Sequence, residues 1–438
     1  MYPTFLNKIL LPLGSLLFSG NYSKYLKQWK YHDKMTTKEL QKTQSEKLTK
    51  LLAYAHQNVP YYRKLKLPDN PQLKDFPILT KSILRSQTDS LLSDKFQKKD
   101  LEQNHSSGSS GEQSFTYMTH DHKFYLRALQ THWWTWGGFR PGEYLVQTGI
   151  SPNRTLPKKF KDFFFRTNYL EAFSLKDDII NNALEKSKNK YPKHLAGYPS
   201  ALNEMAKVAI AANTTYKFES LICYGDKLFG HYKDNFREAF DNPTVINTYG
   251  CAEGLYMACK WDIPYYYIMS PHVVLEIVDD NGNPVPDGNR GHILVTCLTN
   301  LAMPIIRYKL GDLGVLLPKA NYPKKRKFNY PLLREVTGRE TDVIKAPNGN
   351  ILIIHSFTGI LEYYQEIKQY KVIQTSRNSL LIEYISKAGD LSERALSEIK
   401  EKLEILMDGS MEIEFSKVEK IAPLPSGKPQ IIEIRNKE

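Results

Sequence analysis

Hydrophobic and polar positions change period along the middle of the chain. Phe218–Cys223 is largely apolar and predicts a buried strand, the residues up to Phe240 predict a helix, and Thr244–Thr248 again favours a strand. A strand, a helix and a second strand in succession are typical of a parallel sheet. Ligands of such sheets lie beyond the carboxyl ends of the strands, so we expect the loops 224–226 and 249–254 to lie on a functional edge.

Other segments repeat apolar residues at helical spacing. Thr36-Thr-Lys-Glu39 has the form of a capping box in front of a helix that Pro60 stops. Asp121–Gly138 predicts a helix that ends in bulky aromatic residues. Lys193–Ala212 predicts another helix, with Pro199-Ser200 as its start and cap.

From Val273 onward the pattern changes to paired strands. Val273–Val278 and His292–Leu298 are separated by a turn-rich segment, which indicates two neighbouring strands. After Gly338 we expect a last unit of strands with two helices, Thr358–Gln369 and Leu391–Met407.

The length of 438 residues exceeds the size at which a single core stops growing, so more than one domain is expected. We predict an α/β fold with a large N-terminal domain, residues 1–337, made of stacked α/β subdomains and a small β-rich part. Residues 338–438 are predicted to form a small mobile α+β domain. With 41% hydrophobic and 24% charged residues, the composition is that of a globular protein.

The formal net charge of +13 raises the question of a nucleic-acid partner. The lysines are spread along the chain and no nucleic-acid motif accompanies them, so no nucleic acid is expected. A generic basic surface is the simpler interpretation, and an anionic substrate or a membrane surface would also be served. Four scattered cysteines do not suggest a disulfide framework, which favours a reducing, cytoplasmic setting.

The N-terminal segment Ile9–Phe18 is apolar but is interrupted by Pro12 and Gly14. It is too short to span a bilayer, which takes about 20 residues. We expect it to pack on the surface of the domain, with at most peripheral membrane association.

The stretch Ser106–Gln113 is rich in serine and glycine. Its hydroxyls and its unhindered backbone N–H groups can surround an anion such as phosphate. The alternative is a solvated linker, which Ser/Gly-rich segments often form. The spacing matches neither a P-loop nor a nucleophile elbow.

Two further clusters have more than one interpretation. The aromatic residues around Trp133 and Trp136 either pack in the core or form the wall of a pocket for an organic substrate. Cys251, Cys259 and His272 could surround a zinc ion, but they lack a Cys-x-x-Cys spacing, and packing inside the sheet explains them better.

Five short motifs together give a more specific indication. In chain order they resemble the motifs of the adenylate-forming enzymes, in their phenylacetate–CoA ligase-like branch, and especially the homologues of capsule and exopolysaccharide synthesis. The resemblance covers nearly all of residues 100–430. The motifs are Ser106–Gln113, Tyr249-Gly-Cys-Ala-Glu253, Arg307-Tyr-Lys-Leu-Gly-Asp312, Gly338-Arg339-Glu-Thr-Asp342-Val-Ile344 and Pro425-Ser-Gly-Lys428.

The resemblance implies a nucleotide site. Tyr249, with Gly250, would pack on the adenine, Glu253 would hold Mg²⁺, Asp312 would accept from both ribose hydroxyls, and Arg339 would contact ribose and phosphate. The phosphate loop would hold the departing β- and γ-phosphates with Ser106, Ser107, Gly108, Ser109, Ser110 and Gly111.

The resemblance also implies a moving catalytic group. Asp342 would be the pivot of the C-terminal domain, and Lys428 would serve the adenylation step. Catalytic roles therefore fall on Lys428, Glu253 and Arg339. Glu112 and Gln113 replace the usual Lys and Pro of the loop, and Thr341 replaces the first Asp of the hinge motif. These three departures would suit a degenerate, non-catalytic nucleotide-binding homologue or scaffold.

The implied activity is ATP-dependent formation of an acyl-adenylate from an organic carboxylic acid, followed by transfer to coenzyme A. An amine or hydroxyl on a sugar, or a carrier protein, is the alternative acceptor, and a role in cell-surface polysaccharide synthesis would follow. Two anions must approach each other, so catalysis would consist of charge neutralisation and positioning. By analogy, the acid pocket would draw on Trp133, Trp136, Tyr198, Tyr224 and Gly225.

Overall fold

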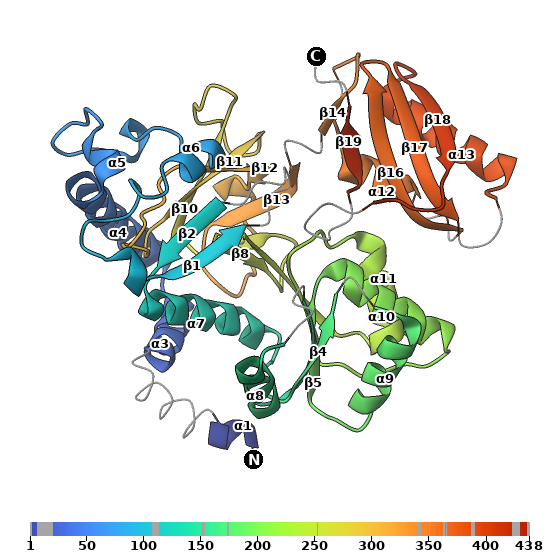
Figure 1. Ribbon diagram of the computed structural model, residues 1–438, viewed down its shortest axis with the longest axis horizontal. Coiled ribbons are helices and arrows are strands. Elements are labelled where there is room, and N and C mark those ends of the chain that lie inside the picture. Colours follow the sequence, from blue (N-terminus) through green and yellow to red (C-terminus); the bar gives the residue numbers. More distant parts are fainter. Residues whose placement is uncertain are drawn as a thin grey trace.

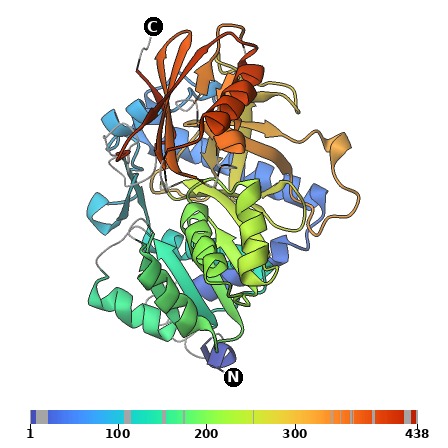
Figure 2. The same ribbon diagram turned by 90° about the vertical axis from the view of Figure 1, so that its right-hand side faces the viewer.

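The computed structural model of the chain is shown in Figures 1 and 2. The structure describes residues 2–6, 21–106, 114–149, 154–172, 175–251, 253–339, 343–349, 351–361, 364, 366–386, 390–422 and 430–435. Its largest element is an eleven-stranded sheet with the order β10-β11-β12-β13-β9-β8-β7-β6-β5-β3-β4.

One half of this sheet is parallel. Its strands are β3 (Tyr144–Gly149), β4 (Thr167–Glu171), β5 (Lys193–Gly197), β6 (Ser220–Cys223) and β7 (Thr244–Cys251). The connecting helices are α8 (Leu156–Phe164), α9 (Asp177–Ser187), α10 (Pro199–Ala211) and α11 (Gly230–Phe240), and the last three stack beside the strands in Figure 1. The predicted succession of strand, helix and strand is therefore confirmed in β6, α11 and β7.

The other half is antiparallel. Its strands are β8 (Leu255–Lys260), β9 (Tyr266–Ile268), β10 (Val273–Val278), β11 (Arg290–Cys297), β12 (Tyr308–Leu316) and β13 (Leu332–Arg339). The predicted strand pair is confirmed, because β10 and β11 are hydrogen-bonded neighbours. β7 joins the two halves, since it pairs with β6 on one side and with β8 on the other.

The N-terminal third supplies helices that cover this sheet. They are α1 (Tyr2–Phe5), α3 (Tyr22–His32), α4 (Thr37–Asn58), α5 (Pro60–Arg63), α6 (Lys81–Ser86) and α7 (His120–Trp136), with short 3₁₀ turns at Leu73–Asp75, Lys98–Asp100 and, later in the chain, Lys319–Asn321. The predicted capping box is present at the start of α4, where the Thr36 hydroxyl accepts from the Glu39 N–H at 3.3 Å and the Glu39 carboxylate accepts from the Thr36 N–H at 2.7 Å.

A hairpin holds the ends of the serine- and glycine-rich stretch. β1 (Glu102–Ser106) and β2 (Ser114–Met118) are antiparallel, and Ser106 lies opposite Ser114. Residues 107–113, which include most of the predicted phosphate loop, lie outside the described residues.

The C-terminal residues form a separate group of elements, drawn in orange and red in Figures 1 and 2. They are β14 (Val343–Lys345), β15 (Ile351–Ile353), α12 (Ile354–Leu361), β16 (Ile367–Ser376), β17 (Ser379–Ser386), α13 (Glu393–Met407), β18 (Glu412–Lys417) and β19 (Ile432–Ile434). A four-stranded sheet, β18-β17-β16-β19, packs with α12 and α13 around its own apolar core, which includes Val372, Leu380, Ile399 and Leu403.

Two helix predictions were wrong at their limits. Lys193–Gly197 is strand β5, fully buried between β3 and β6, and only Pro199–Ala211 is helical. In the C-terminal unit the helix is Ile354–Leu361, and Ile367 begins strand β16. Burial between two neighbouring strands decided the first case, and the β-branched residues of β16 favoured a strand in the second. In the described part of the chain no helix is long and apolar enough to cross a membrane.

Candidate functional site

Two of the predicted nucleotide-binding residues meet at the centre of the large sheet. The Tyr249 hydroxyl, at the end of β7, donates to Asp312 Oδ2 in β12 at 2.8 Å, although the residues are 63 positions apart. Burial raises the pKa of Tyr249, and the charge of Asp312 raises it further, so Tyr249 stays protonated as the donor. Asp312 lies opposite Arg339 in the pairing of β12 with β13, and the side chain of Arg339 lies outside the described residues.

Glu253, the predicted magnesium ligand, follows directly on this strand. Its side chain is buried, with the residue 8% exposed, and its Oε1 accepts from the Tyr308 hydroxyl at 3.2 Å. Among the described residues no lysine or arginine forms an ion pair with it. A buried carboxylate without a positive partner costs free energy, so this position suits a cation.

The hairpin of β1 and β2 contacts the turn that contains Glu253. Thr116 of β2 donates its hydroxyl to the Glu253 carbonyl at 3.0 Å. Gly254 has φ of +85°, and a Cβ there would lie 2.7 Å from Met118 Cε, so this turn needs glycine. The two strands of the hairpin are thus held against Glu253 and Gly254. A linker between domains would not close on two paired strands, so this arrangement favours a local loop.

Arg307 begins the same motif as Asp312 but has a different environment. It is 7% exposed, and its guanidinium donates to the Glu276 carboxylate at 3.2 Å and to the carbonyls of Phe76 and Gly282 at 3.1 and 3.3 Å. Its backbone has φ of +52°, an unfavourable value for arginine. The sequence did not predict that this residue ties three distant segments together.

Lys227 is a residue near the site that the sequence did not single out. Its Nζ donates to the carbonyl of Thr337 at 3.2 Å, directly before the predicted hinge at Gly338-Arg339. Burial lowers the pKa of Lys227 to about 7. Its place after Tyr224-Gly-Asp226 was the only signal that could have drawn attention to it.

Three of the predicted pocket residues lie together. The rings of Tyr198 and Tyr224 are 5.8 Å apart, and a Cβ at Gly225, where φ is +86°, would lie 2.4 Å from Tyr198 Cε1. The Tyr224 hydroxyl accepts from Gln147 Nε2 at 3.1 Å and donates to the Thr148 carbonyl at 2.9 Å. These contacts fix the Tyr224 ring at the carboxyl end of β3.

The two predicted tryptophans belong to another cluster. The Trp136 indole N–H donates to Asp33 Oδ2 at 3.2 Å, and its ring lies 4.6 Å from that of Phe328. Trp133 is 2% exposed and its ring is 5.9 Å from the Tyr256 ring. Both pack in the core that α7 forms with the sheet, which supports the packing alternative for these residues.

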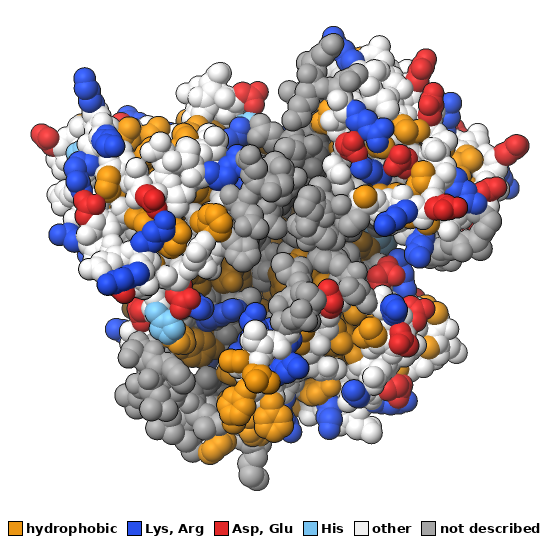
Figure 3. Space-filling view, viewed as in Figure 1, with side chains coloured by type: hydrophobic (Ala, Val, Ile, Leu, Met, Phe, Trp, Pro, Cys, Tyr) orange, Lys and Arg blue, Asp and Glu red, His pale blue; other side chains and the backbone are white. Residues whose placement is uncertain are grey.

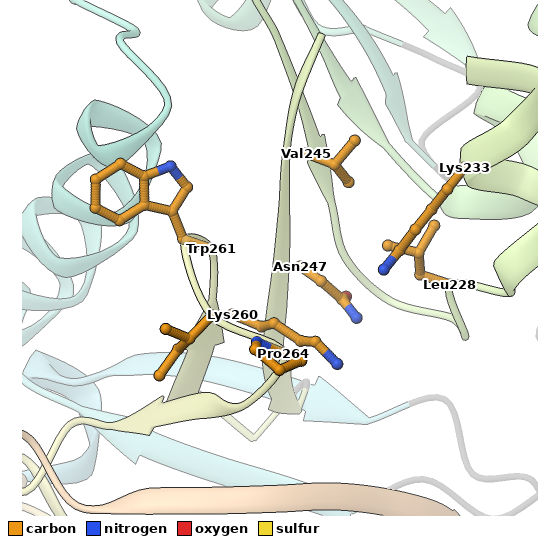
Figure 4. Close-up of a pocket in the computed structure, with 8 residues that line it drawn as sticks. Leu228, Lys233, Val245, Asn247, Lys260, Trp261 and Pro264 are labelled. Atoms are coloured by element: carbon orange, nitrogen blue, oxygen red, sulfur yellow. The ribbon is translucent and has the colours of Figure 1, made fainter. Parts of the chain in front are cut away.

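A cavity of about 220 Å³ lies along β7 (Figure 4), and its lining includes Lys233 and Asn247. Asn247 also donates to the Tyr266 hydroxyl at 2.7 Å, and the Tyr266 ring is 6.4 Å from that of Tyr249. Burial, followed by repulsion from Lys233, lowers the pKa of Lys260, which also lines the cavity. Neither lysine forms an ion pair with a described residue, so the cavity suits a small anion.

The remaining predicted site residues cannot be located. Ser107, Gly108, Ser109, Ser110, Gly111, Asp342 and Lys428 lie outside the described residues. Two of the residues in the alternative zinc site have other surroundings. His272 Nδ1 is 2.8 Å from Thr299 Oγ1, and Cys259 is fully buried. Within the described ranges no three His, Cys, Asp or Glu side chains form a group that could hold a metal ion.

Comparison with known sequences gives partial and full-length similarities. The model of the AMP-binding enzyme family matches residues 170–299. The phenylacetate-coenzyme A ligase of Pseudomonas putida is 28% identical over 149 residues, which is 32% of this chain and 33% of that protein. The match thus spans about a third of that ligase. The protein CapK of Staphylococcus aureus is 19% identical over 97% of this chain and 95% of its own length.

Solved structures of ligases share the fold. A 2-hydroxyisobutyryl-CoA ligase in the postadenylation state superposes with a TM-score of 0.73 at 17% identity, covering 92% of this chain and 90% of that one. The amide bond synthetase McbA of Marinactinospora thermotolerans gives a TM-score of 0.51 at 16% identity, covering 74% and 66%. The predicted α/β fold, with a large N-terminal and a smaller C-terminal part, is confirmed by this likeness.

Proposed function

We propose that this chain, which belongs to the adenylate-forming superfamily, activates an organic carboxylic acid with ATP and transfers the acyl group to coenzyme A. The observation that carries the proposal is the convergence of Tyr249, Glu253 and Asp312. They come from two motifs far apart in sequence, which the hydrogen bonds Tyr249–Asp312 and Tyr308–Glu253 link.

In the proposed first step, a carboxylate oxygen of the acid attacks the α-phosphorus of ATP. The bond from this phosphorus to the bridging oxygen breaks, and pyrophosphate leaves with the electron pair. Asp312 would accept from the ribose hydroxyls, because a carboxylate suits a vicinal diol. The hydrogen bond from Tyr249 orients Asp312 before the nucleotide arrives.

Glu253 is the proposed ligand of Mg²⁺. The fit rests on its buried carboxylate, which has no cationic partner among the described residues. When bound, a divalent cation would offset the negative charge of the phosphates. The Tyr308 hydroxyl would hold one oxygen of Glu253 and leave the other to face the site.

The other motifs complete the proposal. The serine- and glycine-rich loop would hold the leaving pyrophosphate with backbone N–H groups and hydroxyls. Arg339 would contact the nucleotide from β13, opposite Asp312. Lys428 would add positive charge at the α-phosphate, and a hinge at Asp342 would let the residues after it withdraw this lysine afterwards.

In the second step, the thiol sulfur of coenzyme A would attack the acyl carbon and AMP would leave. The names of the relatives support this acceptor. An amine or hydroxyl on a sugar, or a carrier protein, is the alternative acceptor, in keeping with the motifs' resemblance to the capsule and exopolysaccharide homologues. We place the reaction in the cytoplasm, where ATP is available.

The test is isotope exchange between pyrophosphate and ATP over a panel of carboxylic acids, with hydroxylamine added to trap the activated acyl group. We expect at least one acid to give both exchange and a hydroxamate. ATP binding without exchange for any acid would favour the degenerate homologue, in which Glu112, Gln113 and Thr341 would be the cause.

A further inference from the structure

Helix α8 presents an apolar stripe to the outside of the molecule. Leu156, Phe160 and Phe163 follow the spacing i, i+4, i+7 and are 80%, 67% and 79% exposed. Orange side chains gather over α8 at the lower end of the space-filling view in Figure 3. Single exposed apolar residues are normal, but three on one helical face form a patch that suggests contact with another surface.

The remaining exposed side chains of α8 are basic. Lys158, Lys159 and Lys161 are exposed, while the one acidic residue of the helix, Asp162, is buried. Asp162 accepts two hydrogen bonds from Arg154, at 2.8 and 2.6 Å, so its charge is neutralised on the inner side. Apart from Leu156 and Pro157, the outer surface of the helix therefore carries aromatic rings and positive charge.

The positive charge continues into an open cleft next to the helix. The cleft, of about 1030 Å³, is lined by Phe163, Arg166 and Lys190 among others. Neither Arg166 nor Lys190 forms an ion pair with a described residue, and the Arg166 guanidinium lies over the ring of Tyr2 in α1. Phe5 of α1 is 47% exposed beside this cleft.

We infer that α8 and the cleft, together called the α8 face, dock on the surface of an anionic phospholipid bilayer. Phenylalanine and leucine side chains enter the boundary between headgroups and acyl chains, and lysines beside them attract anionic headgroups. A second copy of the chain fits less well, because a two-fold contact would bring the lysines of both helices together. This attachment needs no helix that spans the membrane.

Co-sedimentation of the full chain with vesicles tests the inference. We expect the chain to bind vesicles of phosphatidylglycerol mixed with phosphatidylcholine and to bind pure phosphatidylcholine vesicles more weakly. Added salt should weaken the first interaction, because it screens the lysines.

Matched variants locate the contact. Phe163→Ser should lower binding about tenfold, whereas Ile405→Ser, which removes a similarly exposed apolar side chain from α13, should not change it. The double variant Lys158→Glu, Lys159→Glu should also bind more weakly. Lys324→Glu, Lys325→Glu changes the net charge equally at another exposed site and should bind nearly as the unaltered chain does.

Three results would overturn the inference. They are no binding to anionic vesicles at low salt, equal loss in the α8 variants and in their controls, and a dimer in size-exclusion chromatography that Phe163→Ser dissociates while vesicle binding is absent. The last result would assign the α8 face to a second copy.

Discussion

Arg307 and Asp312 lie at the two ends of one six-residue motif, yet they are used differently. Arg307 is surrounded by the protein, where Glu276, Phe76 and Gly282 accept its hydrogen bonds. Asp312 lies at the edge of the site, where Tyr249 donates to one of its oxygens and Arg339 is opposite. The first residue holds the fold, and the second is the proposed partner of the ribose. A motif that identifies a family therefore need not consist of residues that touch the ligand.

The largest effect is expected at the structural end. Arg307→Ala would leave the half-buried Glu276 without its partner, where burial already raises the pKa of that carboxyl, and would free two carbonyls. We expect a loss of about 3–5 kcal/mol in the free energy of unfolding. Denaturant unfolding measures it. Arg334→Ala is the control, because Arg334 is exposed and its ion-pair partner Glu335 is exposed as well, so a loss of under about 0.5 kcal/mol is expected. Equal losses would contradict the structural role.

Lys428 contrasts with Arg307, because its proposed role is in the reaction and not in the stability of the fold. Lys428→Ala should slow formation of the acyl-adenylate about 100- to 1000-fold and largely spare thioester formation from a supplied acyl-adenylate. The rates of the two half-reactions are measured separately in quenched assays. Lys420→Ala, which removes a lysine close in sequence, is the control. An equal loss in both steps would remove the argument for a moving domain.

A smaller effect is expected at Asp312. Asp312→Ala should weaken binding of AMP about 10- to 100-fold, because hydrogen bonds to a charged group are lost. Thermal unfolding without nucleotide should change little. Calorimetric titration measures the affinity, and Asp234→Ala, an exposed acid on α11, serves as the control. Unchanged affinity for AMP would mean that the ribose assignment is wrong.

The last prediction concerns the dependence of stability on pH. Burial lowers the pKa of Lys227 in the folded protein to about 7, while the unfolded chain keeps the ordinary value of 10.5. Between these values only the unfolded chain binds the proton, so stability should rise with pH from about 7 to about 10. Lys227→Met should remove this part of the rise in denaturant unfolding measured across that range. An unaltered slope in Lys227→Met would show that the lysine is solvated.

The sequence predicted the parts of the fold that depend on local pattern. The strand pairs β6–β7 and β10–β11 and the capped helix α4 follow from apolar spacing and turn residues. It did not predict that β7 continues through β8 into one sheet of eleven strands, because that pairing joins segments of different pattern. Strand β5 was read as helix, since its buried residues carry no alternation.

For the candidate site, the sequence predicted the motifs but not the contacts between their residues. The hydrogen bond between Tyr249 and Asp312 and the closure of the hairpin on Glu253 depend on the path of the chain between them. The roles of Arg307 and Lys227 could not be predicted, because their partners are backbone carbonyls, which any residue supplies. The contact of Trp136 with Phe328 could not be predicted either, because it joins two residues that are far apart in sequence.

The most direct test of the account follows the oxygen atoms. An acid that supports exchange is labelled with oxygen-18 in its carboxylate, and the products of a full turnover are analysed by mass spectrometry. Because the attacking oxygen becomes bonded to the α-phosphorus and leaves with it, the account predicts one heavy oxygen in AMP. Heavy oxygen in inorganic phosphate together with ADP, or AMP without label, would contradict it.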